Sequence, residues 1–144
     1  MQNNEETCWL FNGKPFTSED IGKHFGFVYI IRNKQTGRKY IGRKYFWSIR
    51  KVKGKTRRQR FESDWKEYYG SSEDLNRDVE ILGKQAFIRQ IMSLHLTRGG
   101  TNYEEVKQQY IHEVLESDDY YNTSIGGKYQ TVKSKDMIKA SILI

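Results

Sequence analysis

Two short apolar runs separated by a polar turn predict a β-hairpin in the first third of the chain. The first run is Phe27–Ile31, the second is Lys39–Gly42, and the cluster between them, Asn33–Gly37, ends in a glycine. Apolar or aromatic runs on either side of a glycine-containing turn are typical of hairpins. We therefore expect a hairpin over about residues 27–43.

Helical spacing dominates the second half of the chain. Leu75, Val79 and Leu82 fall on one stripe between a Ser71 cap and a Gly83 stop. After a turn at 98–100, a second helix is expected from about residue 102 to residue 115. Its expected buried stripe contains Val106, Tyr110, Ile111 and Leu115. Residues 87–94 have a β-rich composition and are expected to form a third strand.

The remaining segments give weaker patterns. Residues 1–16 are expected to be a loosely ordered lead-in, and the Thr-x-x-acid spacing from Thr17 predicts a short helix to about residue 24. Residues 45–50 are expected to start a helix, 51–60 to form an exposed loop, and 64–69 to form a helical turn.

Together these elements predict an α+β fold with a small three-stranded antiparallel sheet flanked by helices. We divide the chain into an N-terminal extension with a short helix (1–25), one domain (26–127) and a C-terminal tail (128–144).

The positive charge is concentrated in one window. The chain has 25 Lys and Arg against 18 Asp and Glu, a net charge of +7, and nine of the basic residues lie between positions 43 and 60 with no acidic residue among them. A block of one sign at this density favours a polyanionic partner, and nucleic acid is the natural one. The alternative is a basic loop that only aids solubility. The candidate DNA-binding residues are Lys51, Lys53, Lys55, Arg57, Arg58 and Arg60.

Other bulk features exclude several classes of protein. Cys8 is the single cysteine, so neither an intramolecular disulfide nor a cysteine metal cage can form. No apolar run approaches 18 residues, and the polar residues 1–6 lack the features of a signal peptide. We expect a cytoplasmic protein that does not bind membranes.

The hairpin resembles that of the GIY-YIG nuclease family. Val28-Tyr29 matches the first half of the motif and Tyr40-Ile41-Gly42 the second, with the two tyrosines 11 residues apart. Phe27 stands where the first glycine of the motif would be, and we expect Gly26 to supply the backbone freedom. The resemblance spans about residues 26–127, with 51–63 as a basic insertion. Asp64-Trp65 and Tyr69-Gly70-Ser71-Ser72 are similar to a phage-borne, stand-alone subgroup, which implies host cell cytoplasm if the protein is phage-encoded.

The resemblance implies a metal-dependent DNA endonuclease and assigns its site. Tyr29 would be the base or a proton relay, and Tyr40 would orient water or phosphate. Arg50, ten positions after Tyr40, would stabilise charge on the phosphate. Glu105 would bind Mg²⁺ or Mn²⁺, and Asn122 would order the site through hydrogen bonds.

Several alternatives remain open at this point. The two tyrosines could be cross-strand packing partners, and Arg43 and Lys44 are reserve candidates for the catalytic cation. Glu105 could instead cap a helix with Asn102, and Glu104 has the same spacing from Thr101.

The function also has alternatives. The chain could be a nucleic-acid-binding module without cleavage activity, or a basic protein associated with RNA or the ribosome. No separate recognition domain is evident, so a homodimer or a protein partner could provide specificity.

Overall fold

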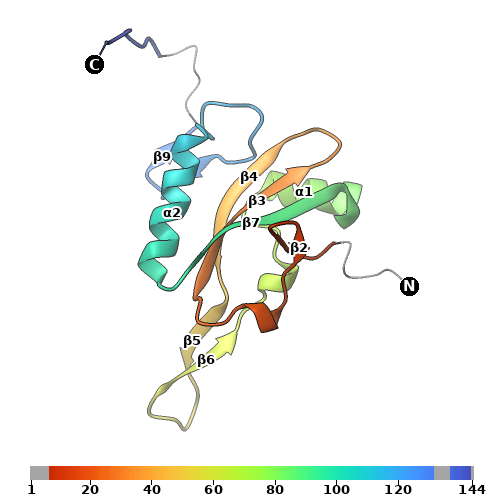
Figure 1. Ribbon diagram of the computed structural model, residues 1–144, viewed down its shortest axis with the longest axis vertical. Helices are drawn as coiled ribbons and strands as arrows, with labels where there is room; N and C mark the ends of the chain where they lie inside the picture. The colour runs from red at the N-terminus through yellow and green to blue at the C-terminus, as the bar shows by residue number, and fades with distance from the viewer. Residues whose placement is uncertain (1–6, 132–136, 144) are drawn as a thin grey trace.

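The computed structural model describes residues 7–131 and 137–143, so residues 1–6 of the predicted extension and 132–136 and 144 of the predicted tail lie outside the described residues. The fold is α+β, with a central five-stranded sheet in the order β2-β1-β7-β3-β4 (Figure 1). The strands are β1 (Leu10–Phe11), β2 (Lys14–Pro15), β3 (Gly26–Asn33), β4 (Lys39–Tyr45), β5 (Trp47–Lys51), β6 (Arg58–Glu62), β7 (Phe87–His95), β8 (Ser124–Ile125) and β9 (Tyr129–Gln130). The helices are α1 (Glu73–Leu82) and α2 (Arg98–Ile111), with 3-10 turns at Ser18–Asp20, Trp65–Glu67 and Lys84–Ala86.

The predicted hairpin and third strand are confirmed. Strands β3 and β4 pair in antiparallel register, with Tyr29 opposite Gly42 and Ile31 opposite Tyr40. Strand β7 pairs antiparallel to β3 on its other side. Strand β4 is therefore an edge strand, and its outer side is open to other parts of the chain.

The prediction of a three-stranded, purely antiparallel sheet is wrong because the lead-in joins the sheet. Strand β1 pairs in parallel with β7, and β2 pairs with β1. Trp9 and Phe16, on either side of these short strands, are buried in the core. Two large aromatic side chains in a polar segment stabilise its docking, since each removes a large apolar area from water.

The two faces of the sheet have separate cores. Tyr29 and Ile31 belong to the larger core, which also holds Leu75 and Val79 of α1. Val28 and Ile41 belong to the smaller one on the opposite face, against which α2 packs. Figure 1 shows α1 and α2 on opposite sides of the sheet. In the predicted first helix, Ser72 rather than Ser71 is the cap, accepting a hydrogen bond from the Leu75 amide at 3.2 Å.

Helix α2 begins earlier than predicted and presents a different face to the sheet. The Thr97 hydroxyl caps it by accepting from the Gly100 amide, so the expected turn at 98–100 is its first turn. The predicted buried stripe is wrong for Tyr110 and Ile111, which are 50% and 59% exposed, whereas Leu115 is buried in the smaller core and Val106 packs against it. The buried residues of α2 are instead Thr101 and Gln109.

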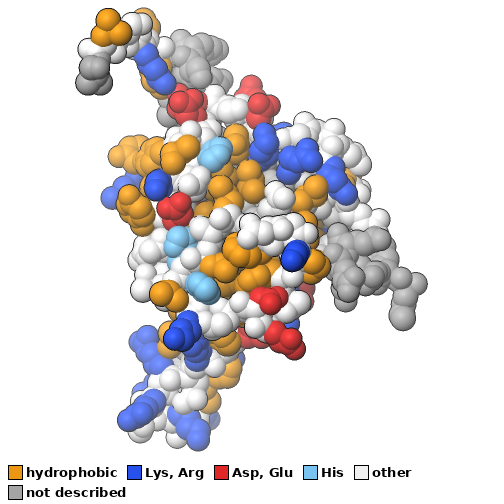
Figure 2. All heavy atoms as spheres, viewed as in Figure 1, with side chains coloured by type: hydrophobic (Ala, Val, Ile, Leu, Met, Phe, Trp, Pro, Cys, Tyr) orange, Lys and Arg blue, Asp and Glu red, His pale blue; other side chains and the backbone are white. Residues whose placement is uncertain are grey.

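Residues 47–62 form a two-stranded ribbon, which contradicts the helix predicted for 45–50. The exposed loop predicted for 51–60 is shorter, covering 52–57 between the two strands. Strands β5 and β6 pair with Ile49 opposite Arg60 and Arg50 opposite Gln59. The ribbon projects from the body of the molecule, and Lys and Arg side chains gather over it (Figures 1 and 2). Arginine–aromatic stacking holds its strands, since Arg60 lies 4.1 Å above the Trp47 ring.

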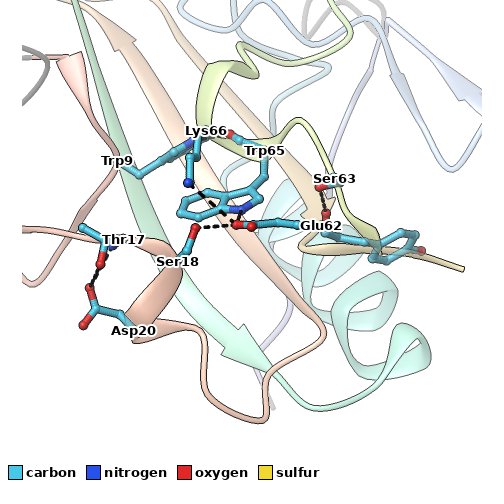
Figure 3. Close-up of polar contacts among 9 residues, drawn as sticks. Trp9, Thr17, Ser18, Asp20, Glu62, Ser63, Trp65 and Lys66 are labelled. Atoms are coloured by element: carbon cyan, nitrogen blue, oxygen red, sulfur yellow. Dashed lines mark hydrogen bonds and ion pairs between the residues drawn. The ribbon is translucent and has the colours of Figure 1, made fainter. Parts of the chain in front are cut away.

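The base of the ribbon is fixed by polar contacts to the body (Figure 3). The carboxylate of Glu62 accepts hydrogen bonds from the Ser18 hydroxyl and from Nε1 of Trp65, and lies 4.0 Å from the Lys66 ammonium. These hydrogen bonds lower the pKa of Glu62. The Ser63 hydroxyl donates to the Tyr45 carbonyl at 2.6 Å. These contacts fix the ribbon where it joins the body of the molecule, at the end of β6 and just before the start of β5.

Candidate active site

The two tyrosines of the hairpin lie side by side on the same face of the sheet. Their ring centroids are 6.2 Å apart. Two glycines make room for them, since a Cβ on Gly42 would lie 2.6 Å from the Tyr29 hydroxyl and 2.8 Å from Cε1 of Tyr40. A Cβ on Gly70, whose φ is +86°, would lie 2.9 Å from the same Tyr40 atom. The spacing of the motif therefore produces a phenol pair, with Gly42 as a steric requirement.

Gly26 has a different role from the one expected. It does not have the positive φ that would require a glycine. A Cβ at this position would instead lie 2.7 Å from the Thr101 hydroxyl. Gly26 therefore allows the first turns of α2 to approach β3, and α2 carries the glutamate of the site.

Both phenols are strongly shielded from water, which favours their neutral forms. Tyr29 is 1% exposed, and burial raises its pKa well above the usual value, with further contributions from Tyr40, Tyr68 and Glu105. Burial also raises the pKa of Tyr40, although its hydrogen bond with the Ser71 hydroxyl, at 2.9 Å, opposes the shift. At ordinary pH both groups therefore carry a proton that each can donate or relay.

The carboxylate of Glu105 acts electrostatically on this phenol pair. Its negative charge contributes to the raised pKa of both tyrosines, although it projects from α2 and they project from the strands. Burial raises the pKa of Glu105 itself, and Arg43 opposes that shift. Nε of Arg43 lies 3.4 Å from Oε1 of Glu105. The site thus contains a half-buried carboxylate beside a guanidinium.

The alternative capping roles for the glutamates are wrong. The Asn102 amide oxygen accepts from the Tyr45 hydroxyl rather than pairing with Glu105. Glu104 accepts from Nε2 of Gln108 and lies 3.8 Å from the Lys107 ammonium. Because α2 starts at Arg98, both glutamates fall beyond the capping positions, and of the two it is Glu105 whose charge raises the pKa of the phenols.

Glu105 can bind a divalent metal only if water or phosphate oxygens supply the other ligands. The residues that the structure describes contain no group of three or more His, Cys, Asp or Glu able to hold a metal ion. Glu105 is a hard oxygen ligand in a place that already accommodates the positive charge of Arg43. Mg²⁺ is commonly bound by one or two carboxylates, with water and phosphate oxygens completing its shell. The donor set therefore fits Mg²⁺ or Mn²⁺ in the presence of a phosphate substrate.

The three candidate cations lie in different places. Arg43 contacts Glu105, and the Lys44 ammonium lies 2.6 Å from the Asp64 carboxylate and 4.1 Å from the centre of the Tyr68 ring. Arg50 lies on β5, exposed, with its guanidinium 4.2 Å above the Phe61 ring. Within the described part of the chain, Arg50 makes no contact with the tyrosines or the glutamate.

Asn122 ties the segment after α2 to the edge strand β4. Its side-chain oxygen accepts from the Ile41 amide at 3.1 Å, and its nitrogen donates to the Ile41 carbonyl at 2.8 Å. Gln109 of α2 donates to the same carbonyl at 2.9 Å. The backbone amide and carbonyl of Ile41, at the open edge of β4, are thus hydrogen-bonded by side chains, which fix the backbone next to Tyr40.

Sequence reasoning missed Tyr68 and the residue that positions it. Tyr68 contributes to the raised pKa of Tyr29 and lies beneath the Lys44 ammonium. Its carbonyl accepts from Nη1 of Arg89 at 2.8 Å, and Arg89 is buried. The sequence does contain a signal for Arg89: it alternates with Phe87 and Ile91 along the predicted strand, and all three are buried on the same side of β7.

Paired tyrosines on adjacent strands, a glutamate from the following helix and an asparagine at the sheet edge define a site of the GIY-YIG type. The chain belongs to the family described as "Putative endonuclease segE, GIY-YIG domain", which it matches over residues 9–125. No match was found among curated proteins or among solved structures. None of the described helices has the length and apolar character needed to cross a membrane.

Proposed function

We propose that the protein is a metal-dependent DNA endonuclease that hydrolyses phosphodiester bonds. The observation that carries this proposal is the ion pair between Glu105 and Arg43, 3.4 Å apart, in which the charge of Glu105 also raises the pKa of Tyr29 and Tyr40 on the hairpin. Membership of an endonuclease family supports the same reaction class.

The reaction needs an activated water and positive charge on the phosphate. Mg²⁺ or Mn²⁺ held by Glu105 would polarise the phosphate and lower the pKa of a bound water. Tyr29 would act as a proton relay: its neutral phenol would accept the proton of the attacking water while donating its own proton to the leaving oxygen. Tyr40, whose hydroxyl is less buried, would orient the water or a phosphate oxygen.

The cation that stabilises the transition state is proposed to be Arg43. It is the basic residue in contact with Glu105, and its guanidinium can bind two phosphate oxygens at once. Lys44 would add positive charge beside Tyr68. Arg50, which the resemblance favours, remains a competing candidate because substrate binding could bring the ribbon closer to the site.

The basic ribbon is proposed to hold the DNA duplex. Its tip and outer strand carry Lys53, Lys55, Arg57 and Arg58, all exposed. A two-stranded β-ribbon has the dimensions to enter the major groove. The target sequence would come from this ribbon, from a second copy of the chain or from a protein partner.

The direct test is incubation with supercoiled plasmid, with Mg²⁺ or with chelator, scored for nicked and linear product. We expect product only with the metal, and none from Glu105→Gln. Glu104→Gln is the matched control, since Glu104 lies one position away and bonds within its own helix. Loss of cutting in Glu104→Gln alone would contradict the assignment of the carboxylate. DNA binding without cleavage by the wild type would favour the non-catalytic binding module.

A further inference from the structure

A cavity of about 320 Å³ lies between the phenol site and the ribbon. Its lining includes Arg43 and Lys44 of β4, Trp47 of β5 and Arg98 at the start of α2. None of the residues that line it is acidic. The cavity is therefore lined by basic residues and extends from Arg43 of β4, the proposed catalytic cation, to strand β5 of the ribbon.

Arg98 is the basic residue lining this cavity that has no carboxylate partner among the described residues. Arg43 and Lys44 already pair with carboxylates. In the described residues Arg98 has no ion pair or hydrogen bond through its guanidinium. It packs instead against aromatic rings, 4.5 Å from the centre of Tyr45 and 5.5 Å from that of Phe25. Stacking of this kind orients a guanidinium and leaves its N–H groups available.

Two further features favour an anion. Arg98 is the first residue of α2, where the free backbone amides and the helix dipole attract negative charge. Trp47 also lines the cavity, and its indole N–H is buried without a hydrogen-bond partner among the described residues. An indole N–H can only donate. The indole N–H of Trp47 and the guanidinium N–H groups of Arg98 are therefore donors that no acceptor of the described residues satisfies.

We propose that this cavity binds a backbone phosphate of the DNA strand next to the bond that is cut, with Arg98 as the main contact. Because DNA strands are continuous, a phosphate held here would connect the scissile position to the segment that the ribbon grips. The identity of the anion rests on the proposed function, whereas the presence of an anion site rests on the cavity itself.

The test is DNA binding measured in chelator, where no cleavage takes place. A short duplex oligonucleotide is titrated over a range of salt concentrations with the wild type, Arg98→Gln and Arg98→Lys. Removing one charged contact to a phosphate reduces the log–log salt slope by about 0.9, and a charged hydrogen bond contributes about tenfold in affinity. We expect both reductions in Arg98→Gln and an unchanged slope in Arg98→Lys.

Arg32→Gln is the matched control, since Arg32 is an exposed arginine at the opposite end of β3 from Gly26. Its salt slope and affinity should remain close to the wild-type values. Equal slopes and affinities for Arg98→Gln and the wild type would overturn the proposal. If Arg98→Gln unfolds, shown by its melting temperature, the comparison passes to Arg98→Ser and Arg98→Lys.

The outcomes separate this inference from the proposed nuclease activity. If the protein nicks plasmid while Arg98→Gln binds DNA normally, the activity stands and the cavity proposal is wrong. If the protein never nicks, yet shows the expected change of slope, the cavity proposal stands and the activity is wrong.

Discussion

Gly42 is the residue on which the geometry of the phenol pair depends. Gly42→Ala would place a methyl group 2.6 Å from the Tyr29 hydroxyl and 2.8 Å from a ring carbon of Tyr40. Overpacking of this kind typically destabilises a protein by about 1–3 kcal/mol and moves the neighbouring side chains. We expect slower nicking together with a lower free energy of unfolding, measured in urea.

The control for this substitution is Gly99→Ala. Gly99 lies in the first turn of α2, and a Cβ there meets no atom within 4 Å. Alanine is preferred to glycine in helices, so stability should be unchanged or slightly raised. Equal nicking rates for Gly42→Ala and Gly99→Ala would show that activity does not depend on the observed positions of the Tyr29 and Tyr40 phenols.

Glu105 should contribute to activity while reducing stability. Burial raises its pKa in the folded protein, so the folded state binds a proton more tightly than the unfolded chain does. Its ionised form therefore destabilises the metal-free protein at neutral pH. This cost disappears as the pH falls below the ordinary glutamate value of about 4.3.

We accordingly expect metal-free Glu105→Gln to be at least as stable as the wild type near neutral pH. Its advantage should shrink on acidification, which melting temperatures in chelator across acidic and neutral pH would show. A Glu105→Gln protein that is clearly less stable at neutral pH would mean that the Arg43 ion pair outweighs the cost of burial.

At the residue scale, the hairpin register was predictable, and it places Tyr29 and Tyr40 on one face of the sheet. The partner of Asn122, the backbone of Ile41, was not predictable from the sequence. The prediction for Arg50 relied on a helix that the chain does not form, since a ribbon occupies that place. Tyr68 was missed because a buried arginine, far away in sequence, holds it.

At the scale of the elements, the short strands β1 and β2 owe their position to their flanking aromatic residues. Trp9 is buried, and its indole N–H donates to the Trp65 carbonyl at 2.6 Å. Replacing a buried Trp by Ala typically costs about 3–5 kcal/mol. We expect this decrease for Trp9→Ala in urea unfolding, and little change for Tyr103→Ala, whose side chain is 69% exposed. Comparable stability of the two variants would contradict this role of Trp9 and would support the loosely ordered lead-in that the sequence predicted.

The errors at this scale share a physical cause. Helix α2 approaches the sheet with Thr101, Glu105 and Gln109, which are four residues apart and polar. Hydrophobic periodicity cannot detect such a polar face, so the predicted stripe wrongly included Tyr110 and Ile111. Similarly, the charge of residues 51–60 suggested a loop, whereas cross-strand pairing and arginine–aromatic stacking form a ribbon.

At the scale of the whole molecule, positive charge and the candidate chemistry occupy different places. Exposed basic residues gather over the projecting ribbon (Figures 1 and 2), whereas Tyr29 and Tyr40 belong to β3 and β4 of the main sheet and Glu105 to α2. The contacts of Glu62 and Ser63 fix the base of the ribbon to the body. This separation implies that substitutions in the two regions should have different kinetic effects.

Neutralising Lys53, Lys55, Arg57 and Arg58 together should weaken DNA binding without removing the chemical step. For each phosphate that the variant no longer neutralises, the log–log salt slope should fall by about 0.9 on duplex DNA. Because these residues lie at the far end of the ribbon, saturating DNA should restore most of the single-turnover cutting rate. A variant that stays slow at saturation would mean that the ribbon also helps to assemble the catalytic site.

Arg43→Ala should behave in the opposite way, because its proposed interaction develops in the transition state. Its affinity for DNA should fall modestly, and no concentration of DNA should restore the rate. Arg50→Ala decides between the two assignments, since Arg50 lies on the ribbon and is the arginine that the resemblance implied as the catalytic cation. We expect saturating DNA to rescue Arg50→Ala as it rescues the ribbon variant, in single-turnover rates measured against DNA concentration. If Arg50→Ala is not rescued and Arg43→Ala is, the catalytic cation comes from the ribbon, and substrate binding must bring β5 to the phenol pair.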